Sequence, residues 1–335
     1  MVGILRHRQP KGSETDRPYL NHRATSRLYN NEKTNIVKRL LMALDSLGVR
    51  EVLYMPDYFH IVPRALEDVD LGLGARALEM PVTGSQEDTT AAAGMMAEAG
   101  AACIVTLGGD GTNRVAAKAC GETPLLPIST GTNNVFGYMV EGTLAGLAAG
   151  LVARGDVPTG QATFRAPRLE LWSGDRFLDM ALVDVVVSQE GFTASRAVWD
   201  VSTIQEIFLT RAEPWNIGFS SVGGRVCPMP QGSGRGLHIR LGPGGKKVQS
   251  PIAPGLIRWL EVASHEVFEP GRDISLARTP AMIALDGERE FSAEPEDRVS
   301  VRINLQGPLV VQVDRVLEAA CDRFLFTQEV GQQGG

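Results

Sequence analysis

The segment at residues 103–112 constrains the fold most strongly. Residues 103–107, Cys-Ile-Val-Thr-Leu, form a short apolar run, which predicts a buried strand. Gly-Gly-Asp-Gly-Thr follows at 108–112, and the pattern at 113–119 is helical. A glycine turn between a strand and a helix lets backbone N–H groups approach a phosphate. Asp110 would repel that phosphate unless a metal ion or a transferable proton mediates, and an ordinary strand-to-helix turn is the alternative.

A second polar loop follows the next apolar run. Leu125 and Leu126 precede Ser-Thr-Gly-Thr-Asn-Asn at 129–134, a dense set of small hydrogen-bonding groups suited to a ribose, an adenine edge or a phosphate. The alternative is a plain turn, because Asn and Gly are common turn formers. Open parallel α/β sheets bind ligands at the carboxyl ends of their strands. We therefore expect both loops at one nucleotide site.

The two motifs together resemble the superfamily of NAD kinases, diacylglycerol kinases and sphingosine kinases, which share GGDGT. The likeness is closest to its AcoX-type branch of ATP-NAD kinase-like proteins, named for acetoin catabolism. The resemblance implies an α/β domain with a Rossmann-like parallel sheet, a C-terminal β-sandwich domain and a final helix that returns to the first domain. It implies ATP and Mg²⁺ as cofactors, NAD as a possible substrate, and nucleotide contacts from Gly108, Gly109, Gly111, Thr112, Asn113, Thr130, Gly131, Thr132, Asn133 and Asn134.

The pattern of elements predicts three parts of the chain. Residues 1–155 alternate strands (2–5, 51–55, 103–107) with helices (34–47, 143–153), and a capping box at 85–88 opens a further helix. Residues 156–312 carry short strand-like runs and predict a β domain. Within it we expect a strand at 217–222, a hairpin turning at 242–247 and a helix at 193–210. A helix at 313–326 opens the third part, residues 313–335.

A third site element lies in the β domain, at Asp286-Gly287-Glu288. Asp-Gly is a common hairpin turn, which is one interpretation. The other is that the triplet resembles the DGE of diacylglycerol kinases. Carried over, Asp286 would bind the metal, Glu288 would act in catalysis, and both would face Asp110 across a cleft. Asp110 would be the general base or the carboxylate that organises the metal.

Two segments depart from the family pattern. Val183 and Asp184 stand where NAD kinases carry Asn-Glu, so an amide partner for a base or ribose is missing, and Asp184 is the remaining nucleotide contact here. The basic stretch at 6–11 replaces a small Asn-Pro turn. It would either reach phosphates in the cleft or form a solvated arm.

Composition narrows the functional class. The net charge of −6 argues against general nucleic-acid binding, and the four scattered cysteines suggest neither a zinc site nor a disulfide framework. No apolar run reaches the ~18 residues of a membrane span, and the start is not a signal peptide, so we expect a cytoplasmic protein. We also expect a homo-oligomer. The leading hypothesis is an ATP-dependent phosphotransferase acting on a hydroxyl of NAD or a related nucleotide. The alternatives are a diacylglycerol or sphingoid kinase, and a nucleotide-binding accessory protein of acetoin-type catabolism without kinase activity.

Overall fold

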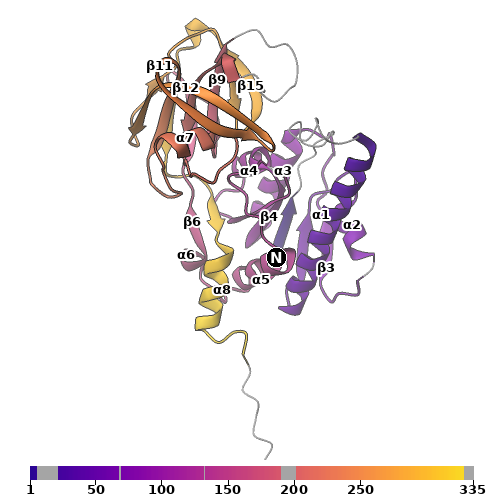
Figure 1. The fold of residues 1–335 in the computed structure, drawn as a ribbon. Helices are drawn as coiled ribbons and strands as arrows, with labels where there is room; N and C mark the ends of the chain where they lie inside the picture. Colours follow the sequence, from indigo (N-terminus) through magenta and orange to yellow (C-terminus); the bar gives the residue numbers. More distant parts are fainter. Residues whose placement is uncertain (6–21, 68, 132, 190–200, 328–335) are drawn as a thin grey trace, which may run out of the picture.

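The computed structural model describes residues 1–5, 22–67, 69–131, 133–189 and 201–327. The basic stretch at 6–11 and Thr132 lie outside the described residues. Figure 1 shows a part with a parallel sheet, in indigo to magenta, and a part made of antiparallel strands, mostly in orange. The predicted change from alternating strands and helices to strands is confirmed.

Seven strands form the first sheet, in the order β3-β2-β1-β4-β5-β17-β6. All neighbours are parallel except β17 and β6. The bounds are β1 (Val2–Leu5), β2 (Glu51–Tyr54), β3 (Gly74–Ala77), β4 (Cys103–Gly108), β5 (Leu125–Ser129), β6 (Thr163–Arg165) and β17 (Leu309–Val311). The last two come from beyond residue 155, so the first sheet is completed by later parts of the chain.

Helices cover both faces of this sheet because its strands are apolar on both sides. Val105 and Leu107 of β4 pack in one cluster with α1 (His22–Ser46), α2 (Ile61–Leu66) and α5 (Gly142–Arg154). Ile104 points the other way, into a cluster with α3 (Gln86–Glu98) and α4 (Asp110–Ala117). Val316 and Ala320 of α8 (Val313–Asp322) join the first cluster, and α8 contacts α5 and the short α6 (Thr159–Ala162).

Two antiparallel sheets make up the second part. One has the order β12-β11-β10-β9-β14-β15 and the other β13-β16-β7-β8. One apolar cluster contains residues of both sheets, such as Val187 and Ile283 from the first and Leu171 and Val301 from the second. The bounds are β7 (Arg168–Ser173), β8 (Arg176–Ala181), β9 (Asp184–Gln189), β10 (Ile204–Leu209), β11 (Gly236–Ala253), β12 (Leu256–Phe268), β13 (Ile274–Ser275), β14 (Ala281–Leu285), β15 (Glu288–Ala293) and β16 (Val299–Asn304), with 3₁₀ turns η2 (Val201–Thr203) and η3 (Pro295–Asp297).

Two element assignments made from sequence are wrong. The helix expected at 193–210 is strand β10 where it is described beyond η2, because Ile207 and Phe208 are buried on opposite faces of the six-stranded sheet. The strand expected at 217–222 is instead helix α7 (Ser220–Val226), which packs Val222 against Ile207 and Leu237. Both errors arise because the few apolar residues in these short segments, Ile-Gln-Glu-Ile-Phe-Leu at 204–209 and Ile-Gly-Phe-Ser-Ser-Val at 217–222, do not distinguish a helical from a strand period.

Two local predictions are also wrong. The chain does not reverse at 242–247: Leu241 and Lys246 both oppose Val262, so the residues between them form a bulge in β11. The capping box does not form either, because the Ser85 side chain makes no capping bond. Asp88 instead accepts the backbone N–H of Gly84 at 2.6 Å and so holds the turn before α3.

Candidate functional site

Asp110 is the first residue of α4, at the carboxyl end of β4. Its buried carboxylate accepts the backbone N–H of Val135 at 2.9 Å and that of Phe136 at 2.9 Å. Burial raises the pKa of Asp110, and these two N–H groups oppose the rise. The predicted strand–turn–helix is therefore confirmed, and its carboxylate is held rigidly by the loop that follows β5.

The glycines of the turn allow neighbouring side chains to come close. A Cβ at Gly109 would lie 2.7 Å from the side-chain amide of Asn134, and one at Gly111 would lie 2.6 Å from Glu288 Oε1. Glu288 of β15 therefore lies against the residue that follows Asp110. The structure thus places Glu288, the second carboxylate predicted to be catalytic, beside the residue that follows Asp110.

Asn113 lies inside the turn. It accepts the Thr106 hydroxyl on Oδ1 at 2.5 Å and donates from Nδ2 to Gly109 O at 3.0 Å. Its side chain is fully buried, and Thr112 beside it is also buried. These contacts fix the shape of the glycine turn, so a nucleotide contact from the Asn113 side chain has no support in the geometry. Gly108 ends β4 and lies under Thr112.

The loop after β5 closes over the turn from the neighbouring strand. The Thr130 N–H donates to Gly108 O at 3.3 Å, and the Asn134 amide lies 2.8 Å from Ser129 Oγ. A Cβ at Gly131 would lie 3.0 Å from the same amide. Asn133 instead approaches the second part of the chain, since a Cβ at Gly218 would lie 3.2 Å from its Oδ1. Among the described residues of this loop that were predicted to bind the nucleotide, Asn133 approaches the second part of the chain.

Asp286 lies in the turn between β14 and β15, where Asp286 and Gly287 both have positive φ, 49° and 80°. Its side chain points inward and accepts the backbone N–H groups of Leu182 at 2.8 Å, Val183 at 2.7 Å and Asp184 at 3.0 Å. Burial raises the pKa of Asp286 to about 7, against the effect of the Leu182 N–H. The triplet is thus a hairpin turn whose carboxylate organises the segment before β9.

This arrangement does not fit a magnesium ion bound by Asp286. Both of its oxygens are already occupied by backbone N–H groups. Within the described ranges, no group of three or more His, Cys, Asp or Glu residues could hold a metal ion. Asp184 lies nearby with its pKa raised well above the ordinary value, by burial and then by the charges of Asp286 and Asp110.

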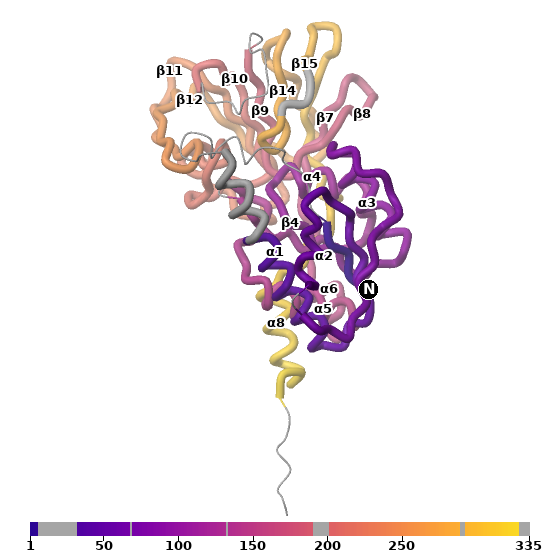
Figure 2. The backbone as a smooth tube through the Cα atoms, turned by 90° about the vertical axis from the view of Figure 1, so that its right-hand side faces the viewer, coloured from indigo at the N-terminus to yellow at the C-terminus, as the bar shows by residue number. Residues whose placement is uncertain are grey.

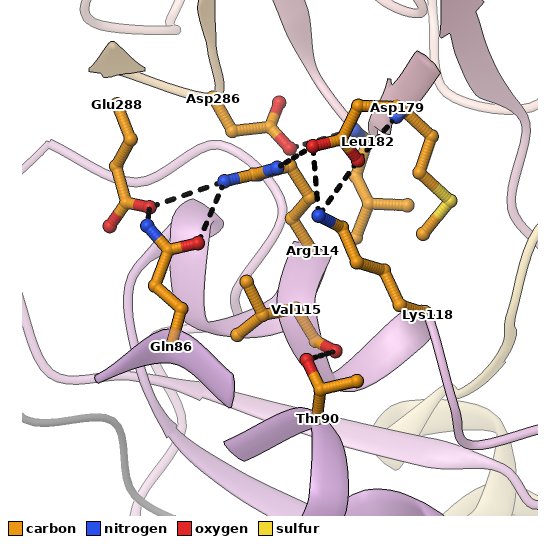
Figure 3. A network of polar contacts seen from close by, with 10 residues as sticks. Gln86, Thr90, Arg114, Val115, Lys118, Asp179, Leu182, Asp286 and Glu288 are labelled. Carbon is orange, nitrogen blue, oxygen red and sulfur yellow. Dashed lines mark hydrogen bonds and ion pairs between the residues drawn. The ribbon is translucent and has the colours of Figure 1, made fainter. Parts of the chain in front are cut away.

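Arg114 connects the two parts of the chain, and the sequence did not reveal this role. Figure 3 shows its side chain between Glu288 and Asp179, with Gln86 and Lys118 completing the network. Its Nη1 donates to Asp179 at 3.1 Å and its Nη2 to Glu288 at 3.3 Å and to Gln86 at 3.2 Å. Burial raises the pKa of Glu288, and Arg114 opposes this. No local pattern pairs residues 65 and 174 positions apart.

Arg211 is a second site residue that the sequence analysis missed. It is buried, 6% exposed, and its guanidinium carbon lies 5.6 Å from the centre of the Phe136 ring. The sequence contained a signal for it: the positive charge of Arg211 comes two residues after the segment 204–209, as expected just beyond the end of a strand. The segment was assigned to a helix, so this position was not recognised.

Several buried polar atoms around this place have no hydrogen-bond partner among the described residues. They come from the loop after β5, the start of β9, the segment between β10 and α7, and the first residue of α7. The atoms are Asn133 Oδ1, Asp184 Oδ1, Arg211 Nη2, Asn216 Nδ2 and Ser220 Oγ. Buried polar groups are normally satisfied, so such a set indicates a ligand site.

The fold and these motifs place the chain in a known class. Residues 22–157 match the model of the ATP-NAD kinase N-terminal domain, and residues 167–306 match that of the acetoin catabolism protein X C-terminal domain. Yeast NADH kinase, solved in complex with NADH, superposes with a TM-score of 0.50 at 14% identity, over 100% of this chain and 89% of its own. The chain therefore has an NAD kinase-like fold.

A curated relative specifies the family. Acetoin catabolism protein X of Cupriavidus necator is 41% identical over 289 residues, which span 82% of this chain and 80% of that protein. The chain belongs to the acetoin catabolism protein X family. This confirms the resemblance stated from the two glycine motifs. In the part of the chain that the structure describes, no helix is long and apolar enough to cross a membrane.

Proposed function

We propose that this protein is an ATP-dependent phosphotransferase that transfers the γ-phosphate to a hydroxyl of NAD or a related nucleotide. The observation that carries the proposal is the position of Asp110, at the sheet edge where α/β folds bind ligands, with its carboxylate aligned by the N–H groups of Val135 and Phe136. The raised pKa of Asp110 suits a general base.

In this mechanism Asp110 accepts the proton of the acceptor hydroxyl. The hydroxyl oxygen bonds to the γ-phosphorus, the bond from that phosphorus to the bridging oxygen breaks, and ADP leaves. Gly109, Gly111 and Thr112 supply backbone N–H groups at the start of α4, where a helix favours anions. Mg²⁺ enters as part of the ATP complex that is the substrate, because Asp286 does not fit a resident metal.

The orphaned polar atoms support a nucleoside or ribose contact. Asn133 Oδ1 and Asp184 Oδ1 are acceptors without a partner, and Thr130, Gly131, Thr132 and Asn134 belong to the same loop as Asn133. Glu288 lies beside Gly111, so its role in this proposal is to position the start of α4 through Arg114.

A second candidate function is a nucleotide-binding accessory protein without kinase activity. The observation in its favour is that both predicted catalytic carboxylates are engaged in the protein: Asp110 accepts two backbone N–H groups and Glu288 is bound by Arg114 and Gln86. A carboxylate engaged in this way can be purely structural.

An acceptor screen tests these functions. ATP consumption is measured with NAD, NADH, nucleosides, diacylglycerol, sphingosine and small hydroxy-ketones, for the wild type and Asp110→Asn. We expect turnover with a nucleotide acceptor and a loss of roughly 10²–10⁴-fold in the variant, and circular dichroism checks that the variant remains folded. Turnover on a lipid alone would indicate the lipid kinase. A melting shift with ATP but no turnover would indicate the accessory protein.

We also propose the domain division 1–155, 156–312 and 313–335, with a β-sandwich in the second domain and a returning helix in the third. The apolar cluster shared by the two antiparallel sheets supports the sandwich, and the burial of Val316 and Ala320 beside the parallel sheet supports the return. β6 and β17 hydrogen-bond into the first sheet, which makes them the crossings between the domains.

The proposal includes a homo-oligomer formed through the β11–β12 hairpin. Trp259 of β12 is 62% exposed, and Trp215, in the segment between β10 and α7, is 78% exposed. Arg225 joins the two segments that carry these tryptophans. It donates to Pro214 O, next to Trp215, and to Gln249 O, and Gln249 pairs with Trp259 across the hairpin. Light scattering on the wild type and on Trp259→Ser tests this surface.

A further inference from the structure

Arg211 forms part of the wall that the second half of the chain contributes to the candidate site. The preceding residue, Thr210, donates its N–H to Val183 O at 3.0 Å, so the Arg211 segment runs beside the start of β9. The Arg211 guanidinium lies over the ring of Phe136, and the N–H of Phe136 binds Asp110 at 2.9 Å. Arg211 is therefore one contact away from the proposed base.

One nitrogen of the buried Arg211 guanidinium, Nη2, has no hydrogen-bond partner among the described residues. Arg211 is only 6% exposed. An arginine keeps its charge in proteins, and a buried charge is unfavourable unless it is paired and hydrogen-bonded. The free donor indicates that an acceptor group belongs at this position.

The carboxylates around Arg211 do not use this donor. The charges of Asp110, Glu213 and Asp286 act on Arg211. Backbone N–H groups bind Asp110 and Asp286, and Glu213 Oε1 accepts the N–H of Gln231 at 3.3 Å. Their charge still offsets part of the cost of burying the guanidinium. Asp184 Oδ1, close to Asp110 and Asp286, is an acceptor without a partner. The orphaned atoms of the site therefore include a cationic donor, Arg211 Nη2, and an acceptor oxygen of Asp184.

We propose that Arg211 binds an oxyanion of the ligand, and that Asp184 accepts a hydrogen bond from a hydroxyl or amine of the same ligand. The ligand class is thus a hydroxylated anion, which rests on the proposed function in placing a ligand at this site. Phosphate and carboxylate share the required chemistry, because the planar guanidinium pairs with either in a two-pronged fashion. A phosphate would come from the nucleotide, and a carboxylate from a small hydroxy-acid acceptor.

Calorimetric titration of the full chain with pyrophosphate, ADP, adenosine and glycerate tests this inference. Arg211→Lys keeps the charge and removes the planar donor pair, and Arg240→Lys, a half-exposed arginine of β11, is the matched control. For a phosphate ligand we expect Arg211→Lys to weaken pyrophosphate and ADP binding about tenfold or more, with adenosine binding unchanged. For a carboxylate ligand, glycerate binding weakens instead. Arg240→Lys changes neither.

Two outcomes overturn the inference. One is a wild type that binds neither pyrophosphate nor glycerate, a result that needs no variant. The other is unchanged affinity for both probes in a folded Arg211→Lys protein. Neither probe requires turnover, so an inactive protein that binds pyrophosphate through Arg211 contradicts the kinase proposal and leaves this inference intact. An active kinase whose turnover is unchanged in Arg211→Lys supports the kinase proposal and contradicts this inference.

Discussion

Glu288 Oε2 accepts a hydrogen bond from Arg114 Nη2 at 3.3 Å, which joins a hairpin of the antiparallel part to the helix that begins with Asp110. Arg114 is fully buried and also donates to Asp179 of β8 at 3.1 Å. The two parts of the chain are thus connected by a buried ionic contact on the wall of the candidate site (Figure 3). Figure 2 shows α4 directly beneath β14 and β15.

Arg114→Met should lower the free energy of unfolding by about 3–5 kcal/mol, because removing one partner of a buried pair leaves the other charge unpaired. Urea unfolding measures this. The control is Arg76→Met, whose pair with Glu51 is exposed and should be worth no more than about 1 kcal/mol. Equal effects of the two substitutions would show that the Arg114 contact does not hold the two parts together.

The carboxylate cluster should make stability fall as the pH rises from about 4 to about 7. Burial raises the pKa of Asp286 from 3.8 to about 7, so in this window the folded protein holds a proton that the unfolded chain has released. A shift of about three units corresponds to at most about 4 kcal/mol. Urea unfolding at pH 5 and pH 7.5 measures the slope, and a rise in stability over this range would contradict the prediction.

Two variants locate the source of that slope. Asp184→Asn removes a second buried carboxyl whose pKa is raised well above its ordinary value, by burial and then by the charges of Asp286 and Asp110, so stability should depend less on pH. Asp273→Asn is the control, because Arg302 lowers the pKa of Asp273 and its titration lies below the window. A slope that is the same in all three proteins would place its origin elsewhere.

The sequence predicted the parallel part of the fold because its signals are local. Residues 103–112 carry a strand, a glycine turn and a helix start in one stretch, and β4 and α4 form there. Residues 125–134 likewise carry a strand, β5, and the polar loop after it, although the next helix, α5, begins only at Gly142. The sequence failed at β10 and α7, which are short segments that mix apolar with polar residues or glycine and show no clear period. Only packing against the six-stranded sheet decides between strand and helix there.

The sequence also predicted part of the site, because some of its residues lie in local motifs. Asp110 and Glu288 stand in recognisable triplets, whereas Arg114 and Arg211 acquire their roles from partners far along the chain. Asp286 was recognised, but its role as a backbone clamp depends on the segment it binds at 182–184, about a hundred residues earlier. Long-range polar contacts of this kind leave no periodic signal in the sequence.

Gly111→Ala should have opposite effects in two backgrounds. In the wild type the new Cβ would lie 2.6 Å from Glu288 Oε1, at the end of a side chain that Arg114 and Gln86 hold. Moving that end aside disturbs these contacts, and a cost of about 1–3 kcal/mol should exceed the roughly 1 kcal/mol that Ala gains over Gly within a helix. In Glu288→Ala the obstacle is gone and the substitution should stabilise. Gly160→Ala, with open space around its Cβ, should act equally in both. Thermal unfolding of the four combinations measures this coupling, and additive effects would refute the contact.

Asn133 and Asn113 should respond differently to truncation, although both were predicted to contact the nucleotide. Asn113→Ala leaves the Thr106 hydroxyl without its acceptor and removes one of the two donors to Gly109 O, which should cost about 1–3 kcal/mol of stability. Asn133 Oδ1 has no partner to lose, so Asn133→Ala should leave the free protein as stable as the wild type. Thermal unfolding of the two variants without ligand measures this difference in stability.

Added MgATP should then separate the two roles. A ligand at 100 times its Kd stabilises the folded protein by about 2.7 kcal/mol. If Asn133 Oδ1 accepts a hydrogen bond from the nucleotide, Asn133→Ala should weaken ATP binding by up to about tenfold and reduce the thermal shift, whereas Asn113→Ala, titrated below its lower melting temperature, should retain much of the affinity. A full shift in Asn133→Ala would mean that the orphaned amide serves some other group, and the nucleoside would then have to lie against the glycine turn alone.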